Sequence, residues 1–505
     1  MQKVDLLVIG SGPAGQRAAI QGAKLGKKVI LVEKKTVVGG VCTNTGTIPS
    51  KTLREAIVFL SGYRQRHVYG RSYMVKRGVT FADLMVRVDS VIRHEIEVAL
   101  DRTLRNGVEL VYGTARFEGP NQVAVDAGDT TQVYEADRII VATGTKPYRA
   151  ERVPFNDSTI IDTDAFFKPD FPVKELPKSM LIVGAGVIGT EYASMFAAMG
   201  VDVRLLDRRT ELFRFLDHEI NEALTYHMRN ERVTLYLGKD FSEIHEDANG
   251  KVVTKLENGR SIKTDMLLFA SGRSGASLAL DLDKAGVEVN SRGLIDVNSD
   301  LQSSVPHIYA AGDIIGFPAL ASTSMEQGRM AACHAFDVPC FSDNELLPYG
   351  IYTIPEISMV GKTEQELSEA GIPYEIGIAR YREVARGQIM GDEIGILKLT
   401  FHQKTGRLLG VHILGESASE LLHIGQAVMA FNGSISYFVD TVFNYPTLAE
   451  AYKIAAMNGL KRLGAQAQHD PELRVAKDTF VESVEEQLAA EANTEAPKPL
   501  DESEA

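Results

Sequence analysis

One pattern occurs twice in this chain and limits what the chain can fold into. The stretch VDLLVIGSGPAGQRAAIQGAKLGKKVILVEKK, from Val4, aligns without a gap with KSMLIVGAGVIGTEYASMFAAMGVDVRLLDRR, from Lys178. Each copy reads as an apolar strand, a glycine-rich turn, a helix and a second apolar strand that ends in an acid. The repeat therefore predicts two βαβ units, each at the start of a doubly wound α/β domain.

The glycines of the two copies share the spacing G-x-G-x-x-G. They are Gly10, Gly12 and Gly15 in the first copy and Gly184, Gly186 and Gly189 in the second. The first glycine permits a tight turn, the second lets a pyrophosphate approach the backbone, and the third packs the helix against the strand. The pyrophosphate then lies at the helix N-terminus, where free N–H groups favour an anion. The acids at the strand ends, Glu33 and Asp207, suit ribose hydroxyls, so we expect two bound dinucleotides.

Length, charge and cysteine content exclude several classes of protein. A chain of 505 residues is too long for one core, so several domains are expected. The formal net charge of −13 gives no electrostatic footprint for nucleic acid or an anionic membrane. No apolar run is long enough for a bilayer, and the first strand begins too early for a signal peptide, so we expect a cytoplasmic location. Cys42, Cys333 and Cys340 have no metal-ligand spacing and no disulfide framework, and no metal site is expected.

Further segments fit the doubly wound plan. RIIVATGTKP (138–147) and MLLFASGRS (266–274) read as apolar strands that end in small-residue turns. HIYAAGDIIG (307–316) puts Asp313 just after another strand. A carboxylate at this edge of a parallel sheet can reach a ribitol or ribose hydroxyl.

The pattern changes from about Leu346 onward. LKLTFHQKTGRLLGVHILG (397–415) alternates like antiparallel strands around a TG turn, and two helix-like stretches follow up to Leu463. These features predict a separate α+β domain. Past Gly464 the chain is rich in Ala, Glu and Pro, which predicts one short helix followed by a disordered end. The apolar stripe of that helix would be Leu473, Phe480, Val484 and Leu488.

Two motifs carry a resemblance to a known family. The first is GTIPSK (46–51), which follows a single cysteine, and the second is FNYPTLAEAY (443–452). Over most of its length the chain resembles the two-dinucleotide-binding flavoprotein disulfide reductases, such as lipoamide dehydrogenase and glutathione reductase. The resemblance implies an α/β fold with two Rossmann-like domains, for FAD and NAD(P), and a C-terminal α+β domain. That last domain would form a homodimer or a higher even oligomer.

The resemblance also divides the chain. Residues 1–150 and 276–345 would form the FAD-binding domain and 151–275 the NAD(P)-binding domain. Residues 346–464 would form the interface domain, and 465–505 an acidic tail.

By the same resemblance, residues spread over the FAD-binding domain would hold the cofactor. They are Gly10, Gly12, Gly15, Glu33, Lys34, Gly39, Gly40, Cys42, Thr43, Lys51, Ala115, Thr143, Gly144, Asp313 and Ala321. The helix that starts within 320–324 would point its N-terminus at the flavin and stabilise negative charge there. The nucleotide substrate would contact Gly184, Gly186, Ile188, Gly189, Glu191, Asp207, Arg208, Arg209 and Gly272.

Two parts of the family's disulfide chemistry are missing from this sequence. The disulfide-reducing members carry a second cysteine in a C-x4-C arrangement, but Thr47 stands in that position and cannot form a disulfide. They also carry a His–Glu pair whose histidine protonates the leaving thiolate. Tyr445 replaces that histidine, and a phenol with a pKa of about 10 is a poor partner for a thiol. Disulfide reduction is therefore not expected, and Cys42 is interpreted as a packed residue.

The remaining residues suit hydride exchange between NADPH and NAD⁺ by way of FAD. The resemblance implies that Lys51 and Glu191 form an ion pair beside the flavin. The alternatives are a helix-surface lysine and an ordinary acid in the first turn of a helix. By the resemblance, the segment with Tyr445 and Glu450 would complete the catalytic set across the dimer interface. The bend at Pro446 would turn Tyr445 inward, and Glu450 would begin the next helix.

Nucleotide choice depends on the end of the second copy. Asp207 suits the two ribose hydroxyls of NAD, and Arg208 and Arg209 suit the 2′-phosphate of NADP, unless they are solvated loop charges. Two other functions stay open. One is an NAD(P)H dehydrogenase or oxidase that passes electrons to a quinone or oxygen. The other is a non-catalytic FAD protein that recruits a partner, although an inert protein has no need of a second intact fingerprint.

Overall fold

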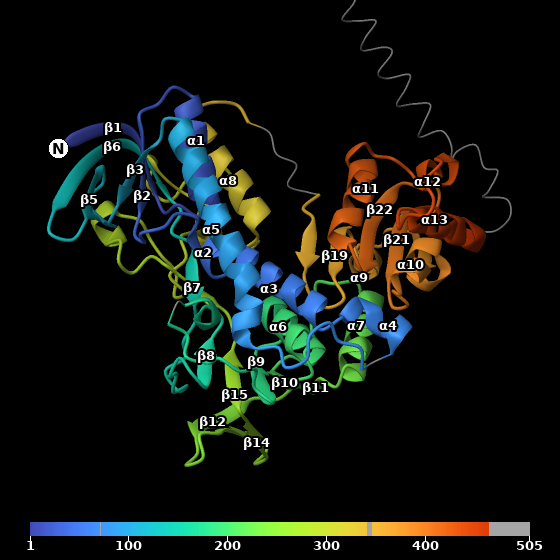
Figure 1. The fold of residues 1–505 in the computed structure, drawn as a ribbon. Coiled ribbons are helices and arrows are strands. Elements are labelled where there is room, and N and C mark those ends of the chain that lie inside the picture. Colours follow the sequence, from blue (N-terminus) through green and yellow to red (C-terminus); the bar gives the residue numbers. More distant parts are fainter. Residues whose placement is uncertain (71, 169, 341–345, 464–505) are drawn as a thin grey trace, which may run out of the picture. The chain divides into compact units, whose positions relative to one another are not determined.

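The computed structural model describes residues 1–70, 72–168, 170–340 and 346–463, so the helix expected in the tail lies outside the described chain. The chain divides into two compact units, drawn in Figure 1. The first unit contains residues 1–213, 225–343 and 352–354. The second contains 214–224, 344–351 and the chain from Pro355 onward. The finer division into five segments stays a prediction.

The first unit contains a sheet built on the first copy of the repeat. β1 (Gln2–Ile9) pairs in parallel with β2 (Val29–Glu33), and α1 (Pro13–Lys24) connects them, as the repeat predicts. The strand order is β3–β2–β1–β6–β5–β4, with β17 also paired to β6. The other strands are β3 (Glu109–Tyr112), β4 (Thr114–Gly119), β5 (Gln122–Asp126), β6 (Thr131–Val141) and β17 (Ile308–Ala310). Because β17 pairs with β6, a segment from far along the chain returns to this sheet.

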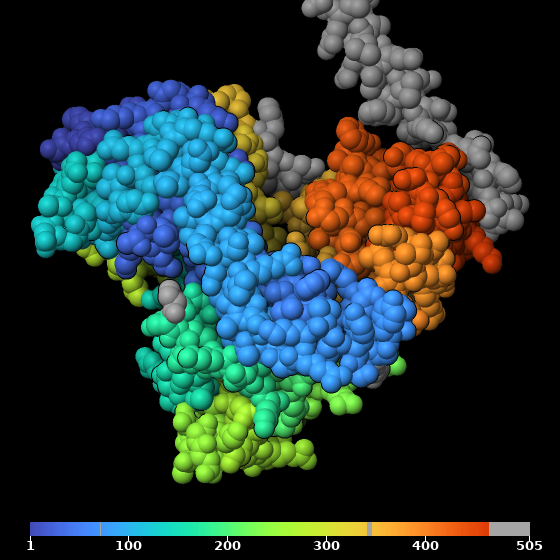
Figure 2. Space-filling view, in the orientation of Figure 1, coloured from blue at the N-terminus to red at the C-terminus, as the bar shows by residue number. Residues whose placement is uncertain are grey.

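Helices cover one face of this sheet because alternate residues of β1 point to opposite sides. Leu6 and Val8 pack with α1 and with α8 (Ala321–Ala335), which lie side by side in Figure 1. Leu7 and Ile9 pack on the other face with residues of β4 and β5. Further helices of this unit are α2 (Gly40–Asn44), α3 (Thr47–Leu60), α4 (Arg66–Tyr69) and α5 (Phe81–Arg105). The outer side of α5 forms part of the face shown in Figure 2.

The second copy of the repeat forms a second, wholly parallel sheet in the same unit. β9 (Ser179–Val183), α6 (Val187–Ala198) and β10 (Asp202–Asp207) match β1, α1 and β2. The order is β11–β10–β9–β15–β8, with β8 (Ile160–Asp162), β11 (Thr234–Leu237) and β15 (Met266–Phe269). Small antiparallel sheets join β7 (Thr145–Pro147) to β16 (Arg273–Gly275), and β12 (Phe241–Glu246), β13 (Val252–Leu256) and β14 (Ser261–Thr264).

The second unit is an α+β domain around an antiparallel sheet, as predicted. Its order is β18 (Tyr349–Ile351), β19 (Ile357–Gly361), β22 (Leu408–Leu414), β21 (Ile396–His402) and β20 (Tyr374–Arg380). The predicted hairpin in 397–415 is the β21–β22 pair. The two predicted helices are α11 (Ala418–Ala430) and α13 (Glu450–Leu463), which pack on the sheet. Shorter helices are α9 (Glu364–Glu369), α10 (Ala385–Met390) and α12 (Ser436–Asp440).

A segment from the middle of the chain joins this second unit. Arg214–Leu224 includes the start of α7 (His218–Asn230) and packs with the C-terminal domain. Asp217 there accepts a hydrogen bond from the Lys398 ammonium at 2.9 Å, and neither side chain is exposed. A buried charge is costly without a partner, so this pair helps to hold the segment in the second unit.

In the described part of the chain, we find no helix that combines the length and the apolar composition needed to cross a membrane.

Candidate functional site

The first glycine fingerprint lies in the turn between β1 and α1. Gly10 has φ +103°, and a Cβ there would lie 2.5 Å from the Ala142 carbonyl oxygen. A Cβ at Gly15 would overlap the Gly10 carbonyl oxygen. Gly12 differs, because its backbone is extended and its Cβ position is open, with the Gly40 Cα nearest at 4.0 Å. The chain therefore leaves space where the pyrophosphate of FAD is expected.

The second fingerprint, between β9 and α6, repeats this geometry. Gly184 has φ +108°, and a Cβ there would lie 2.6 Å from the Ala270 carbonyl oxygen. A Cβ at Gly189 would overlap the Gly184 carbonyl oxygen. The Cβ position of Gly186 is again open, with an Arg209 nitrogen nearest at 3.8 Å. Packing does not require a glycine at either middle position, so the residues fit two bound dinucleotides.

The acids at the ends of β2 and β10 are tied to the glycine-rich turns. Glu33 is buried and accepts hydrogen bonds from the Ser11 hydroxyl at 2.5 Å and the Ser11 N–H at 3.1 Å. Asp207 accepts one from the Ala185 N–H at 2.6 Å. Burial raises the pKa of Asp207, but hydrogen bonds from Arg209 and Ala185 outweigh this, and the pKa lies below its ordinary value. Asp207 is therefore ionised at neutral pH.

Both arginines after β10 have carboxylate partners within the chain. Arg209 donates to Asp207 from Nε at 3.0 Å and from Nη2 at 2.7 Å. Arg208 donates from Nε to Asp240 at 2.7 Å, and its side chain is 70% exposed. A 2′-phosphate would have to share or replace these carboxylates, and the selection of NADP by these residues stays a prediction.

The segment around the single cysteine packs against the first fingerprint. The Gly39 N–H donates to the Ser11 carbonyl oxygen at 3.1 Å. Gly40 lies close to Gly12, since a Cβ added to Gly40 would lie 2.8 Å from the Gly12 Cα. Thr43 is buried in α2. Burial raises the pKa of the Cys42 thiol, and a hydrogen bond with the Thr47 side chain only partly offsets this. Because a thiolate is the nucleophile, this environment disfavours thiol chemistry at Cys42.

An ion pair joins α3, which follows the first repeat in the chain, to α6, the helix of the second repeat. Lys51 Nζ on α3 lies 2.7 Å from Glu191 Oε2 on α6. The other Glu191 oxygen accepts the Tyr352 N–H at 2.8 Å, and the Lys51 ammonium lies 5.0 Å from the Tyr352 ring centre. The alternative that Glu191 is a first-turn acid is wrong, because Glu191 comes after the first turn of α6. Its flavin role stays a prediction.

A hydrogen-bond network leads from the cysteine segment to Asp313. The Thr45 hydroxyl donates to Asp164 at 3.2 Å, and Arg273 lies 3.5 Å from the same carboxylate. Arg273 Nε donates to the Thr145 hydroxyl at 2.8 Å, which donates to Asp313 at 3.3 Å. Burial raises the pKa of Asp164. Sequence reasoning missed this network, and its only signal is Arg273, the first residue of β16.

Several groups near the end of β6 and the start of α8 are open to a ligand. The Thr143 hydroxyl oxygen is buried and has no hydrogen-bond partner among the described residues. Gly144 has φ +66°, and nothing lies near its Cβ position. α8 begins at Ala321, as predicted, with no side-chain cap and no acid in its first turn. These features fit a ligand that donates to Thr143 and presents negative charge to the helix.

The remaining predicted contacts lie on the same elements. Lys34 is exposed just after β2, and Ala115 is buried in β4. Ile188 is half-buried in the first turn of α6. Gly272 has φ +115° and an open Cβ position after β15. Their contacts with nucleotides stay predictions.

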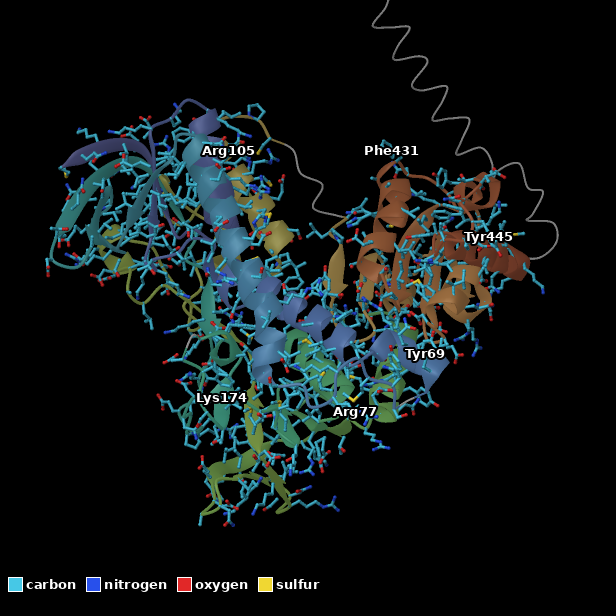
Figure 3. The ribbon with its side chains drawn as sticks, in the orientation of Figure 1. Tyr69, Arg77, Arg105, Lys174, Phe431 and Tyr445 are labelled. Carbon is cyan, nitrogen blue, oxygen red and sulfur yellow. The ribbon has the colours of Figure 1, made fainter. Side chains whose placement is uncertain are left out.

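The last two predicted catalytic residues belong to the second unit. Tyr445, labelled in Figure 3, is 68% exposed in the single chain, and its expected inward position across a dimer interface stays a prediction. Glu450 begins α13, as predicted, and its Oε2 is buried without a hydrogen-bond partner among the described residues. A catalytic role for either stays a prediction.

Comparison with known proteins defines the class. Residues 4–328 match the sequence family described as pyridine nucleotide-disulphide oxidoreductase, and residues 347–456 match its dimerisation domain. The chain therefore belongs to the pyridine nucleotide-disulphide oxidoreductase family. Within that class it is 50% identical to the soluble pyridine nucleotide transhydrogenase of Mycobacterium tuberculosis, over 93% of this chain and 99% of the relative.

A further relative and two solved structures are also similar to this chain. The soluble pyridine nucleotide transhydrogenase of Aliivibrio fischeri is 44% identical over 91% of this chain and 97% of the relative. The flavoprotein disulfide reductase RclA from Escherichia coli has a TM-score of 0.79 and 26% identity, covering 90% of this chain and 99% of its own. LpdA from Mycobacterium tuberculosis has a TM-score of 0.82 over 92% of this chain and 100% of its own, and at 21% identity it supports the fold alone.

Proposed function

We propose that this chain is an FAD enzyme that exchanges hydride between NADPH and NAD⁺, with the two nucleotides taking turns at one site. The relatives named soluble pyridine nucleotide transhydrogenase support this activity. The structural observation that carries the proposal is the Lys51–Glu191 ion pair. It joins α3, which follows Cys42, to the helix of the second repeat, in a chain that has no second cysteine at position 47.

Bound FAD would supply the chemistry, because its ring accepts a hydride from one nicotinamide and returns it to another. The chain's own residues hold and orient the ligands. Gly12 and Gly186 would leave room for the two pyrophosphates, and Glu33 and Asp207, at the ends of β2 and β10, would bind the ribose hydroxyls. Asp313 would bind the ribitol chain, oriented through Thr145.

Two charged elements would act at the flavin ring. The Lys51 ammonium is fixed by Glu191, so it would provide a positive charge that does not reorganise when hydride arrives. The N-terminus of α8 has free N–H groups and no acid in its first turn, so it would stabilise negative charge on the ring.

Disulfide reduction is not part of the proposed function. That reaction needs a thiolate and a resolving thiol, but burial raises the pKa of Cys42 and Thr47 offers only a hydroxyl. Tyr445 cannot replace the histidine that protonates a leaving thiolate, because a free phenol titrates near pH 10.

We further propose that the enzyme is a cytoplasmic homodimer. The second unit matches the family's dimerisation domain and leaves apolar side chains exposed, among them Phe431 at 68% and Val442 at 91%. Burial of such side chains against a second copy would stabilise a dimer. Light scattering should report at least twice the mass of one chain, and an active monomer would contradict this part of the proposal.

The activity itself is tested under anaerobic conditions. The FAD-loaded protein is mixed with NADPH and thio-NAD⁺, whose reduced form absorbs apart from NADPH. We expect reduction of thio-NAD⁺ without another acceptor, with the parallel double-reciprocal lines of ping-pong exchange. NADPH oxidation that requires oxygen or a quinone would instead indicate a dehydrogenase or oxidase. A protein that binds FAD but does not oxidise NADPH would be the scaffold.

A further inference from the structure

Two cysteines that are seven positions apart come together at the C-terminal end of α8. The chain reverses there, because the N–H groups of Phe336 and Val338 both donate to the Cys333 carbonyl oxygen, at 3.1 and 2.9 Å. Asp337 adopts φ +54° within this reversal. The turn returns Cys340 to α8, where its sulfur lies within hydrogen-bond reach of the Cys333 thiol. Both thiols are free.

His334 lies beside this pair in an orientation that suits a base. Its Nδ1 lies 2.8 Å from the Asp300 carbonyl oxygen, which can only accept, so Nδ1 carries the proton of the neutral ring. Nε2 is then the acceptor, and it lies 3.3 Å from the Cys340 sulfur. The Cys340 thiol therefore donates to His334, the arrangement in which imidazole activates a thiol.

The two thiols differ in exposure. Cys333 is 2% exposed, whereas Cys340 is partly open to solvent. The Arg329 guanidinium, on α8, acts electrostatically on both thiols and favours a thiolate. Burial and the neighbouring Cys333 raise the pKa of Cys340, so the reduced pair rests as two thiols. An oxidant from solvent would thus meet Cys340 first, with Cys333 behind it to resolve the product.

We propose that Cys333 and Cys340 form a peroxide-sensitive dithiol that closes reversibly to a disulfide. His334 takes the proton of Cys340, and the thiolate attacks one oxygen of hydrogen peroxide, which gives a Cys340 sulfenic acid and water. The Cys333 thiol then attacks the sulfenic sulfur, which forms the disulfide and releases a second water. Two thiols and one peroxide become one disulfide and two waters, and a small dithiol reductant reverses the change.

This dithiol is separate from the proposed flavin chemistry. Cys333 lies twelve residues after Ala321 on α8, which corresponds to about 18 Å along the helix axis at 1.5 Å per residue. The N-terminus of α8 would face the flavin, so the dithiol is too distant for direct exchange with the ring. The inference does not depend on which acceptor receives hydride.

The test uses the full-length, FAD-loaded protein treated with hydrogen peroxide, then alkylated in denaturant and digested with trypsin. Both cysteines fall in one peptide, Met330–Lys362, because no Lys or Arg separates them. We expect this peptide to lose both alkylation sites and to become lighter by two hydrogen atoms, with recovery in dithiothreitol. Cys42 should remain alkylated. Cys333→Ser and Cys340→Ser should each abolish the change, whereas Cys42→Ser, the matched control, should keep it.

A further variant tests the base. His334→Asn should slow disulfide formation at least about tenfold, because general-base assistance is removed. The inference is overturned if peroxide leaves both thiols alkylated, or converts Cys340 to a sulfinic acid while Cys333 stays free. It is also overturned if Cys42 reacts before either of them.

Discussion

Lys51 Nζ and Glu191 Oε2 lie 2.7 Å apart, although the two residues are 140 positions apart in the chain. Lys51 belongs to α3, which follows the first fingerprint, and Glu191 belongs to α6, which the second fingerprint opens. The Glu191 side chain is only 3% exposed, and a buried carboxylate is costly without a partner. The ion pair therefore helps to fix α3 against the helix of the second repeat, and it does so in the absence of a redox disulfide.

Replacing Lys51 tests this relationship. Lys51→Met should lower the rate at which NADPH reduces the flavin by about ten- to a hundredfold, because a charged hydrogen bond is worth roughly 1.5–3 kcal/mol. FAD content should stay close to that of the wild type. Lys51→Arg keeps the charge and should lose less. Lys24→Met, at an exposed position of α1, is the control, and an equal effect there would contradict the assignment.

The glycines of the first fingerprint should respond differently to alanine. Gly12→Ala meets no atom closer than 4.0 Å, so the protein should fold but bind FAD at least about tenfold more weakly, because the methyl group occupies the pyrophosphate's space. Gly15→Ala would overlap the Gly10 carbonyl oxygen and should destabilise the fold itself. Flavin absorbance and thermal unfolding of the FAD-free proteins separate the two effects. A Gly12→Ala protein with full FAD affinity would refute the position given to the pyrophosphate.

The arginines after β10 should act on NADPH more than on NADH. Replacing both Arg208 and Arg209 with Ala should raise the KM for NADPH by about ten- to a hundredfold, the value of a charge-assisted phosphate contact. The KM for NADH should change little, because NAD lacks the 2′-phosphate. Arg209 already donates to Asp207, and Arg208 to Asp240. Binding of the 2′-phosphate would therefore include the release of the two arginines from these carboxylates. Equal changes for both nucleotides would show that the arginines serve only those carboxylates.

A buried histidine should make the second unit sensitive to mild acid. Burial lowers the pKa of His412, which is 1% exposed and is faced by Asp217, Lys398 and Glu366. In the unfolded chain a histidine takes up a proton near pH 6.5. Below that pH the unfolded state binds more protons than the folded state, so stability is lost as pH falls. Asp217 titrates at lower pH still and does not contribute in this window.

The measurement is the melting temperature between pH 7.5 and 5.5. The wild type should lose stability over this range, and His412→Gln should flatten the dependence. His423→Gln, at an exposed position of α11, is the matched control and should keep the wild-type slope. An unchanged slope in His412→Gln would contradict the assignment.

Features that depend on local spacing could be predicted from the sequence. The two βαβ repeats, the β21–β22 hairpin and the starts of α8 and α13 follow from apolar periodicity and glycine position, which neighbouring residues determine. Glycine was expected at positions 12 and 186 to leave space for a pyrophosphate, and the Cβ positions of Gly12 and Gly186 are open.

Features that depend on contacts between distant residues could not be predicted. Arg273 reaches Asp313 only through Thr145, and no spacing in the sequence indicates that contact. Arg214–Leu224 belongs to the second unit, where Asp217 pairs with the distant Lys398. Cys333 and Cys340 meet because the chain reverses after α8, at a turn that contains no glycine to indicate it in the sequence.

The most direct measurement is a single turnover followed in a stopped-flow instrument without oxygen. The FAD-loaded protein is mixed with about one equivalent of NADPH and then with NAD⁺. Hydride exchange predicts that the yellow flavin absorbance is lost with NADPH and restored by NAD⁺, with one NADH formed for each NADPH consumed. Absorbance that returns only when oxygen or a quinone is admitted, or that NADPH never removes, would contradict the proposed function.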